Sequence, residues 1–595
     1  MKARYFQDEL AYLRESGRFF AQNNPKLSRY LSERSTDPDV ERLLEGFAFL
    51  TSKLREKLDD ELPELTHSVI NLLMPNFLRP FPATTLMKLS PVEKAFTERH
   101  VVPAKSKILS RAVDDVICPF RTTADTDVYP LEIVEQHLER TRQSTDLAVK
   151  FQTLSGLPTS KIGLKDLRLW MCGDPVSAQL LYLWIGRYLK KLTLVIQGDG
   201  EQGEIQRKYD VPLRQLSPGG FGADESILPN GNASYEGYRL LQEYFVFPHK
   251  FQCFDLKGLS SYFQSGSGIE FTLLFEFERP LPPSVKVRPD SIRLYCVPAV
   301  NLFQYDAEPM NVDHRKLRYP IRPSGDPKNS IDIFSITNVV SWRAVEDLHT
   351  RSHLREYPTF ESFHHEVERA DGMMQIYYRL RLREALRGRG MEHLVSFVRH
   401  DSQPAIPEHE VLSAELLCFN GHHAQELATG DICIPTEETP SYVKFENLLQ
   451  PTQPVFPPLD GSLYWSLISN LSLNYVSLLS KEALETVISA YDFQARSDRQ
   501  AERVSKQRMK GIVSIDTKPV DKLFRGQAVR GLTSRMTMSE EAFQSEGDMY
   551  VFASVLAEFF SLYSSVNSFH ELIMEGVENN EVYKWPAKIG RQPLI

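Results

Sequence analysis

The sequence has few cysteines, and none of them stands in a metal-binding or redox pattern. The closest two of its six cysteines, Cys418 and Cys433, lie fifteen positions apart, so there is no CxxC pair and no zinc-ribbon spacing. Cysteines this scattered in a chain of 595 residues fit a reducing compartment. We therefore expect a cytoplasmic protein.

Long apolar runs and an excess of positive charge are also missing. No window approaches the roughly 18 apolar residues of a membrane-spanning helix, and the start, MKARYFQDEL, lacks the apolar stretch of a signal peptide. The net charge is −9 and the pI is near 6.0, which weighs against nucleic acid or anionic lipid as the partner of the whole protein. We expect a soluble protein with no direct membrane insertion and no bound nucleic acid.

Signatures of enzymes are equally scarce. There is no GxxxxGK[ST], GxGxxG, GxSxG or HExxH pattern. His349 and His353 are four residues apart and His364 and His365 follow, but Pro358 limits any helix, so we interpret these histidines as surface or interface residues. No pair of carboxylates can be placed across a sugar-binding cleft. We predict no catalytic residue, no cofactor and no metal.

What the chain does have is length and a change of pattern along it. At about 150 residues per domain it predicts three or four domains. The first 75 residues are helical by pattern, short alternating strands follow from about residue 84 to 440, and PTQPVFPPLDGS is typical of a stiff linker. We predict a multidomain α+β fold with an N-terminal helical bundle, β-rich middle domains and a C-terminal α+β region. The predicted limits are 1–83, 84–324, 325–450 and 451–595.

Single helices are predicted within this plan. They are a possible helix at SYEGYRLLQEYF, a pair at 463–479 and 481–491, and a helix at 548–565 that is apolar nearly all round. A helix with apolar residues on every side has to be buried. The last hundred residues are predicted to alternate strand, strand, helix, strand, strand.

The first predicted helix, residues 2–23, carries two apolar seams. Phe6, Leu10, Leu13 and Phe20 form one stripe. A second seam of Tyr5, Tyr12 and Phe19 recurs every seventh residue, about 100° or more around the helix. A single stripe is enough to dock a surface helix on its own domain. Two seams indicate either a two-sided core helix or a helix that also packs against another chain.

A second predicted helix begins in DPDVERLLEGFAFL, residues 37–50. Asp37 is a good N-cap and Pro38 suits the first helical position. Val40, Leu43, Leu44, Phe47 and Leu50 then follow at helical spacing, whereas Phe49 lies on the opposite, polar side. Gly46 weakens the helix, so a close backbone contact is one explanation for it. We expect Phe49 to be a partner contact.

The most distinctive polar feature is YYRLRLREALRGRG. Alternation places Arg379, Arg381 and Arg383 on one strand face and Leu380 and Leu382 on the other. The arginines either form a solvated face opposite acidic neighbours or bind an acidic partner surface.

Several long segments resemble the TssF family of bacterial type VI secretion. They include ELAYLRESGRFFAQNNP, DPDVERLLEGFAFL, KLDDELPELT, LMPNFLRPFP, CVPAVNLFQYDAEPMNVDHR, FRGQAV and WPAKIGRQPLI. The resemblance covers essentially the whole chain in order.

The resemblance implies a structural, non-enzymatic baseplate subunit. Two copies of a TssF-like protein pair with one smaller TssG subunit as a wedge. Wedges surround a VgrG spike hub, together with TssE and with TssK, which ties the baseplate to the inner face of the cytoplasmic membrane. Sheath and tube proteins polymerise on this platform. Two alternatives stay open: a wedge protein of a contractile phage tail or phage-tail-like particle, and a carbohydrate-active enzyme.

Overall fold

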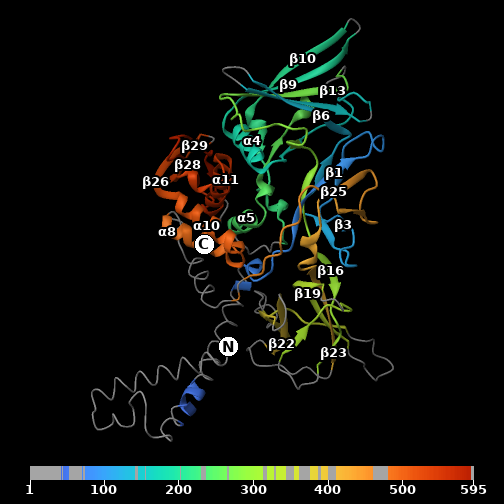
Figure 1. Cartoon of the computed structure of the whole chain (residues 1–595), viewed down its shortest axis with the longest axis vertical. Helices are drawn as coiled ribbons and strands as arrows, with labels where there is room; N and C mark the ends of the chain where they lie inside the picture. The colour runs from blue at the N-terminus through green and yellow to red at the C-terminus, as the bar shows by residue number, and fades with distance from the viewer. Residues whose placement is uncertain are drawn as a thin grey trace, which may run out of the picture.

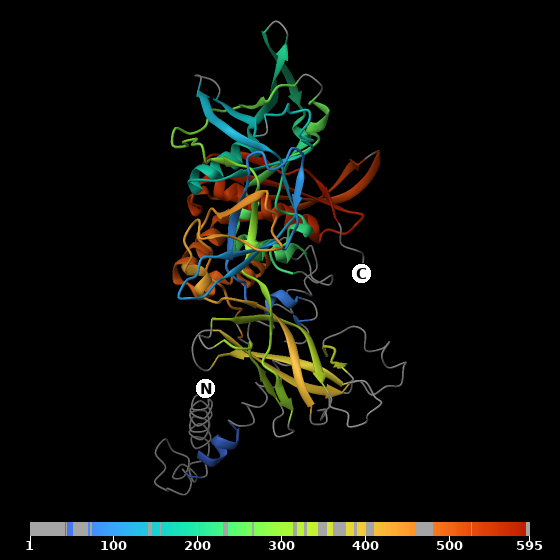
Figure 2. The same cartoon turned by 90° about the vertical axis from the view of Figure 1, so that its right-hand side faces the viewer.

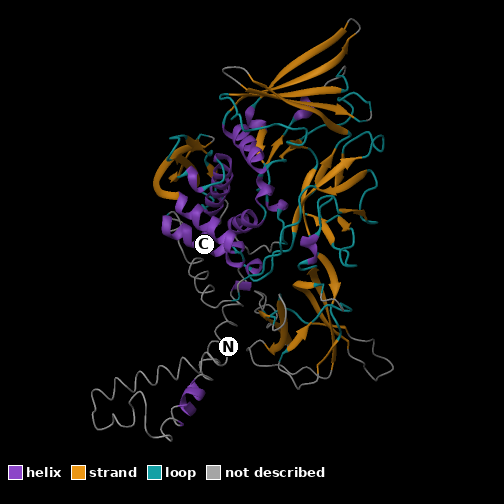
Figure 3. Cartoon of the chain, in the orientation of Figure 1, coloured by secondary structure: helices purple, strands orange, loops and turns teal. Residues whose placement is uncertain are grey.

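The chain is elongated, with sheets stacked along its length and a helical layer at one side (Figures 1 and 3). The computed structural model describes residues 42, 45–51, 70–71, 74–140, 145–154, 156–200, 203–229, 236–263, 267–312, 318–326, 330–342, 354–360, 376–385, 390–399, 410–457, 459, 480–524 and 526–590. Together these residues form an α+β, multidomain and mostly β-rich fold, as predicted. The predicted N-terminal bundle lies almost wholly outside the described residues.

The central sheet joins strands from distant parts of the chain. Its order is β24-β3-β4-β15-β1-β25. The strands are β1 (Thr84–Pro91), β3 (Lys107–Ser110), β4 (Pro119–Thr122), β15 (Cys296–Val300), β24 (Ile432–Pro435) and β25 (Val443–Asn447). β1 pairs with β25 through registers such as Leu89 with Phe445. Strands from both sides of residue 324 therefore share one sheet, and the predicted division at 324 does not separate two sheets. The domain limits stay predictions.

A five-stranded sheet forms the top of the molecule in Figure 1. Its order is β10-β9-β13-β7-β6, and the strands are β6 (Leu131–Arg140), β7 (Thr145–Thr153), β9 (Leu189–Gly200), β10 (Gly203–Val211) and β13 (Glu270–Phe277). β13 alternates strictly, with Phe271, Leu273 and Phe275 fully buried. Such alternation is typical of a sheet with one face on a core.

Smaller sheets complete the upper half. β11 (Leu216–Pro218), β12 (Cys253–Leu256), β8 (Leu167–Met171) and β14 (Ile292–Arg293) form one, and β2 (His100–Val102) pairs with β5 (Thr126–Val128). The single-turn 3₁₀ helices are η2 (Pro75–Phe77), η3 (Leu213–Gln215), η4 (Ala223–Glu225), η5 (Pro248–Phe251), η6 (Leu259–Ser261), η7 (His423–Glu426) and η9 (Glu540–Ala542).

The lower part has its own hydrophobic core. Two sheets surround it, one built on β23 with β16, β17, β19 and β20, and one ordered β18-β22-β21. Their strands are β16 (Phe303–Asp306), β17 (Met310–Val312), β18 (Tyr319–Ile321), β19 (Asp332–Trp342), β20 (Leu354–Glu356), β21 (Ile376–Glu384), β22 (Met391–Arg399) and β23 (Glu410–Phe419). Val395, Leu412 and Val339 are fully buried there.

The C-terminal region is built around one helix. β26 (Ile512–Phe524) and β27 (Gln527–Met538) form a long hairpin that projects from the body in Figure 2. β27 then runs parallel to β28 (Phe569–Gly576), and β29 (Val582–Lys584) and β30 (Lys588–Ile589) pair with β28. Parallel strands need a crossover connection, and α11 (Glu546–Tyr563) supplies it.

Glycines bring α11 close to two other helices. α11 packs on α4 (Pro175–Arg187) and on α5 (Glu236–Val246). A Cβ at Gly547 would lie 2.4 Å from the backbone of Gln179, and one at Gly237 would lie 2.9 Å from Phe559. Only glycine permits backbones to approach so closely. The C-terminal region is thereby joined to the upper half.

Of the labelled α-helices among the described residues, three were predicted and three were not. α8 (Lys481–Tyr491), α5 and α11 confirm the predicted segments, and α11 is buried on nearly every side. The segment 463–479 lies outside the described residues. α4, α9 (Gln494–Ser497) and α10 (Arg499–Gly511) were not predicted.

Candidate functional site

The helix at residues 45–51 exposes three large apolar side chains. It lies at the foot of the molecule, away from the β-rich body, in both Figure 1 and Figure 2. Phe47 is 58%, Phe49 54% and Leu50 62% exposed, while Ala48 between them is buried. The predicted helix is confirmed at residues 42 and 45–51. The sequence places Phe47 and Leu50 on one apolar stripe, and both side chains are exposed in the structure. We call Phe47, Phe49 and Leu50 the N-terminal apolar cluster.

Because the three side chains of this cluster are exposed, the chain does not gain the free energy that their burial would contribute. Fully burying one such side chain contributes about 1.5–3 kcal/mol. Phe49 was predicted as exposed on the polar side, and the structure adds Phe47 and Leu50 to it. Among the residues that the structure describes, no atom lies within 4 Å of the position that a Cβ of Gly46 would take, so no described contact explains the glycine.

The other predicted aromatic contacts are not placed. Tyr5, Tyr12 and Phe19 lie outside the described residues. Their role at a partner interface stays a prediction.

The arginine strand is confirmed as β21, an edge strand that pairs with β22. Arg383 forms an ion pair with Glu392 at 2.7 Å across the two strands, and the Arg379 guanidinium lies 4.2 Å from the centre of the Phe360 ring. Arg381, on the same face, is half-buried. At Arg383 the strand therefore has an acidic neighbour on its own sheet, which is one of the two interpretations that the sequence left open. Binding of an acidic partner here stays a prediction.

A buried ion cluster fixes the glycine-rich segment Ser217–Gly222 (SPGGFG) to α5. Glu243 accepts bonds from Arg239 at 2.9 Å, from Lys250 at 2.5 Å and from the backbone N–H of Ile227 at 2.8 Å. The side chains of all three charged residues are at most 5% exposed. Burial lowers the pKa of Lys250, and the adjacent Glu243 carboxylate opposes that shift. Arg239 also donates to the carbonyls of Phe221 and Gly222, so the cluster is structural.

A serine and a histidine meet in the C-terminal sheet. Ser534 Oγ lies 2.9 Å from His570 Nε2 and 2.8 Å from Thr517 Oγ1. Burial lowers the pKa of His570 to about 3. Ser534 is fully buried and His570 is 2% exposed, so no substrate reaches this pair. Sequence reasoning missed it because strand pairing, not spacing, brings residues 534 and 570 together.

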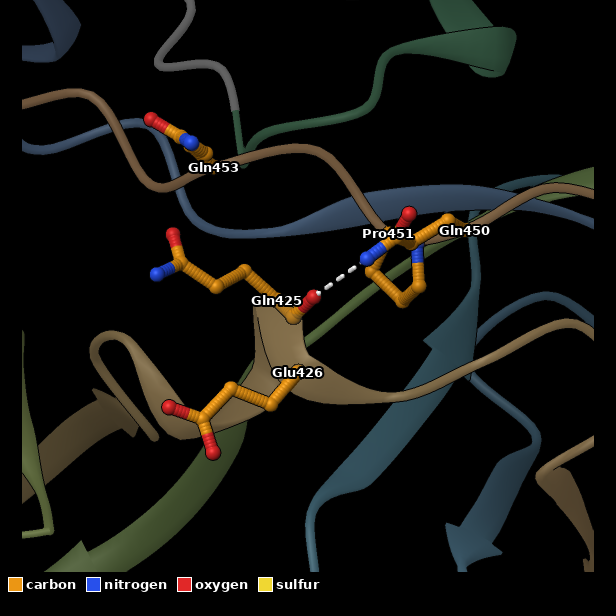
Figure 4. Close-up of a pocket in the computed structure, with 5 residues that line it drawn as sticks. All are labelled: Gln425, Glu426, Gln450, Pro451 and Gln453. Atoms are coloured by element: carbon orange, nitrogen blue, oxygen red, sulfur yellow. Dashed lines mark hydrogen bonds between the residues drawn. The ribbon is translucent and has the colours of Figure 1, made fainter.

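One shallow polar cavity of about 410 Å³ lies beside η7 (Figure 4). Gln425, Glu426, Gln450, Pro451 and Gln453 line it, and Gln450 Nε2 donates to the Gln425 carbonyl at 3.0 Å. Glu426 points away from that bonded pair in Figure 4. With one carboxylate, this cavity lacks the facing pair that a glycosidase needs.

Histidines do not assemble a metal site in the part of the chain that the structure describes. His422 and His423 have ring centres 4.4 Å apart, but no group of three His, Cys, Asp or Glu residues suitable for a metal ion occurs among the described residues. His349, His353, His364 and His365 lie outside them. None of the described helices is long and apolar enough to cross a membrane.

This chain matches known proteins of one family along nearly its whole length. The family described as "Type VI secretion system, TssF" matches residues 2–592. A curated relative, the type VI secretion system component TssF1 of Pseudomonas aeruginosa PAO1, is 26% identical over 644 aligned positions, which cover 99% of each protein.

Two solved structures have the same fold. One is a chain of the type VI secretion system TssK-TssF-TssG baseplate subcomplex, with 27% identity, a TM-score of 0.76, and 93% of this chain and 99% of that chain covered. The other is a chain of the type VI secretion baseplate complex, with 25% identity, a TM-score of 0.61 and full coverage of both chains.

These matches place the chain in the class of bacterial type VI secretion system baseplate components. Within that class, the chain belongs to the TssF family.

Proposed function

We propose that this chain is a structural, non-enzymatic wedge subunit of the type VI secretion baseplate. The observation that carries the proposal is the agreement in fold, over 93% of this chain, with a chain from a TssK-TssF-TssG subcomplex. In this role the chain acts through its surfaces, by binding other subunits. The enclosed Ser534–His570 pair and the one-carboxylate cavity are consistent with that role.

In the partner set proposed for this chain, the TssG-type subunit and TssK follow the solved TssK-TssF-TssG subcomplex, and the other partners follow the family resemblance. The set comprises a TssG-type subunit, a second copy of this chain, and TssK, TssE, the VgrG hub and the sheath proteins. We place it in the cytoplasm, at the inner face of the membrane through other subunits, with no nucleic acid partner. Several modest interfaces on one chain make such a ring firm, because each bound subunit raises the effective concentration of the next.

The N-terminal apolar cluster is the proposed contact with the TssG-type subunit. Three exposed large side chains, Phe47, Phe49 and Leu50, supply apolar area that a partner helix would bury. The open space beside Gly46 leaves room for a partner backbone to approach closely. The seam of Tyr5, Tyr12 and Phe19 is proposed to extend the same interface.

Co-expression with the smaller TssG-type neighbour tests the proposal. Wild-type chain is expected to co-purify with it as a stable complex. Phe49→Ala is the first variant to measure, and Tyr12→Ala with Phe19→Ala is the second. Loss of the complex with unchanged solubility supports the interface. If both variants leave complex formation unchanged, the cluster and the seam are incidental.

A matched pair of glycine variants sharpens this test. Gly46→Leu adds a side chain at a position with no described atom nearby, so the thermal stability of the lone chain should not fall. The complex should weaken if a partner backbone occupies that space. The control is Gly46→Ala, which adds only a methyl group at the same position. Gly430→Leu would be a poorer control, because Gly430 has a φ of +85°.

A further inference from the structure

α10 carries a stripe of positive charge on its exposed side. At 100° per residue, Arg499, Arg503, Lys506 and Lys510 fall within an arc of about 60°. All four are exposed. With a rise of 1.5 Å per residue the stripe extends about 16 Å. We call these four residues the α10 basic stripe.

Among the described residues, Lys506 is the one member of the stripe that has a carboxylate partner. Lys506 forms an ion pair with Glu502 at 2.5 Å, on the same helix. Among the described residues no carboxylate lies within 4.0 Å of Arg499, Arg503 or Lys510. The pKa of Glu502 is lowered by its hydrogen bond to Lys506 and further by the charges of Lys506, Arg499 and Arg503, as expected for one acid among several cations.

The stripe is held on a fixed frame. Asp498 caps the helix by accepting from the backbone N–H groups of Gln500 and Ala501 at 3.1 and 3.2 Å. On the far side, Arg508 is bonded to both carboxylate oxygens of Asp548 on α11 at 2.9 and 3.1 Å. Met509 is buried beside it. A rigid helix loses little conformational freedom when its exposed face binds.

The charge is also segregated along the sequence. Residues 494–538, which form α9, α10 and the β26–β27 hairpin, hold eleven arginines and lysines against four acids, a net charge of +7. The whole chain has a net charge of −9, so the remaining residues carry −16. An isolated basic surface on an acidic protein favours a local acidic partner over non-specific polyanion binding.

We propose that the α10 basic stripe binds an acidic segment of a protein partner, with carboxylates repeated along one face of a helix. The match is geometric, because glutamates at i, i+4, i+7 and i+11 would follow the same line as the four cations. A membrane surface is disfavoured because the stripe has no apolar face to insert; Val504 is the exposed apolar residue of α10 and lies on another side. Nucleic acid is disfavoured because α10 has no aromatic side chain on which bases stack.

The proposed binding site lies on α10 and is independent of the proposed baseplate role. The probe is a fluorescein-labelled, alanine-based helical peptide of about 20 residues with glutamates at i, i+4, i+7 and i+11, and its control has glutamine at those positions. Binding to the full-length chain is followed by fluorescence anisotropy at 50 and 300 mM NaCl. The wild-type chain should bind the glutamate peptide, more weakly at the higher salt concentration, and should not bind the glutamine peptide.

Two charge-matched variants decide whether the stripe is the site. Arg499→Gln, Arg503→Gln, Lys506→Gln and Lys510→Gln together should weaken binding at least about tenfold, because four exposed ion pairs are lost. The control replaces four exposed lysines elsewhere by glutamine: Lys161, Lys165, Lys257 and Lys286. It should stay within about twofold of wild type, and circular dichroism should show that both variants are folded.

Three results would overturn the proposal. The first is no binding of the glutamate peptide at 50 mM NaCl, and the second is an equal loss in both variants. The third is tighter binding of the wild-type chain to phosphatidylserine vesicles or to duplex DNA than to the peptide at the same salt concentration. None of these results affects co-purification with the TssG-type subunit, so the two proposals fail separately.

Discussion

Two helices of this chain have apolar residues on more than one side, but these residues are buried in one helix and exposed in the other. In α11, Met549, Phe552 and Leu556 are fully buried. In the helix at residues 45–51, Phe47, Phe49 and Leu50 are each more than half exposed. The hydrophobic pattern is similar, but α11 finds α4, α5 and β28 in its own chain. In α11 the apolar residues are covered by the chain itself, whereas the exposure of Phe47, Phe49 and Leu50 is what motivates the proposed contact with another chain.

Glycines mark the same contrast. Gly547 in α11 faces the backbone of Gln179, 2.4 Å from where its Cβ would be, whereas Gly46 faces open space. A glycine that costs helix stability is explained in the first case by a contact within the chain. In the second case no described contact explains the glycine, which is why Gly46 is part of the proposed interface.

The largest predicted effect is a difference in stability between truncating a buried phenylalanine of α11 and truncating an exposed one of the 45–51 helix. Phe552→Ala should lower the free energy of unfolding by about 3–5 kcal/mol, because it opens a cavity beside Tyr244 and Phe543. Phe49→Ala should change it by no more than about 0.5 kcal/mol in the lone chain. Chemical denaturation followed by tryptophan fluorescence measures both. Equal losses would mean that the 45–51 helix is already packed within the chain.

The second prediction uses the glycines. Gly547→Ala should destabilise by about 1–3 kcal/mol through overpacking against Gln179. Gly46→Ala should leave the body unchanged and stabilise its own helix by up to about 1 kcal/mol. Thermal melts of the two variants check this. A destabilised Gly46→Ala chain would contradict the open space seen beside Gly46.

The third prediction concerns pH and the core that α11 covers. The pKa of His570 is lowered to about 3 in the folded state, against about 6.5 when unfolded. Below pH 6.5 His570 is therefore protonated in the unfolded chain but not in the folded chain. The free energy of unfolding then falls by up to about 1.4 kcal/mol for each pH unit. His570→Gln removes this contribution, so the stability difference between wild type and variant should shrink as the pH drops from 7 to 5. A difference independent of pH would show that His570 titrates normally in the folded protein.

The smallest predicted effect is at the arginine strand. Arg383→Gln breaks an ion pair with Glu392 whose side chains are 48% and 36% exposed. Such pairs contribute about 0–1 kcal/mol, so the melting temperature should hardly move. A large loss in the lone chain would show that β21 depends on this pair for its fold.

The sequence was most informative where structure is local. The local hydrophobic pattern predicted α5, α8 and α11, and alternation predicted β21. α4 was missed although Asp174 and Pro175 repeat the start signal seen at Asp37 and Pro38; its Asp174 cap accepts from Ser177 at 3.0 Å.

Long-range pairing was beyond the sequence. β1 and β25 pair across more than 350 residues, and no local pattern specifies that register. Arg239 and Glu243 show an i, i+4 spacing, but Lys250 completes their cluster only through the fold. Phe49 was a candidate because it breaks a polar face. The exposure of Phe47 and Leu50 was missed because an apolar stripe normally indicates burial.

The most direct test of the account is size-exclusion chromatography of the chain co-expressed with its TssG-type subunit, as wild type and as Phe47→Ala, Phe49→Ala and Leu50→Ala combined. We predict that the triple variant elutes alone, with the same melting temperature as the lone wild-type chain. A triple variant that still elutes as the intact complex, or that unfolds at a clearly lower temperature on its own, would contradict the claim that these side chains are reserved for a partner.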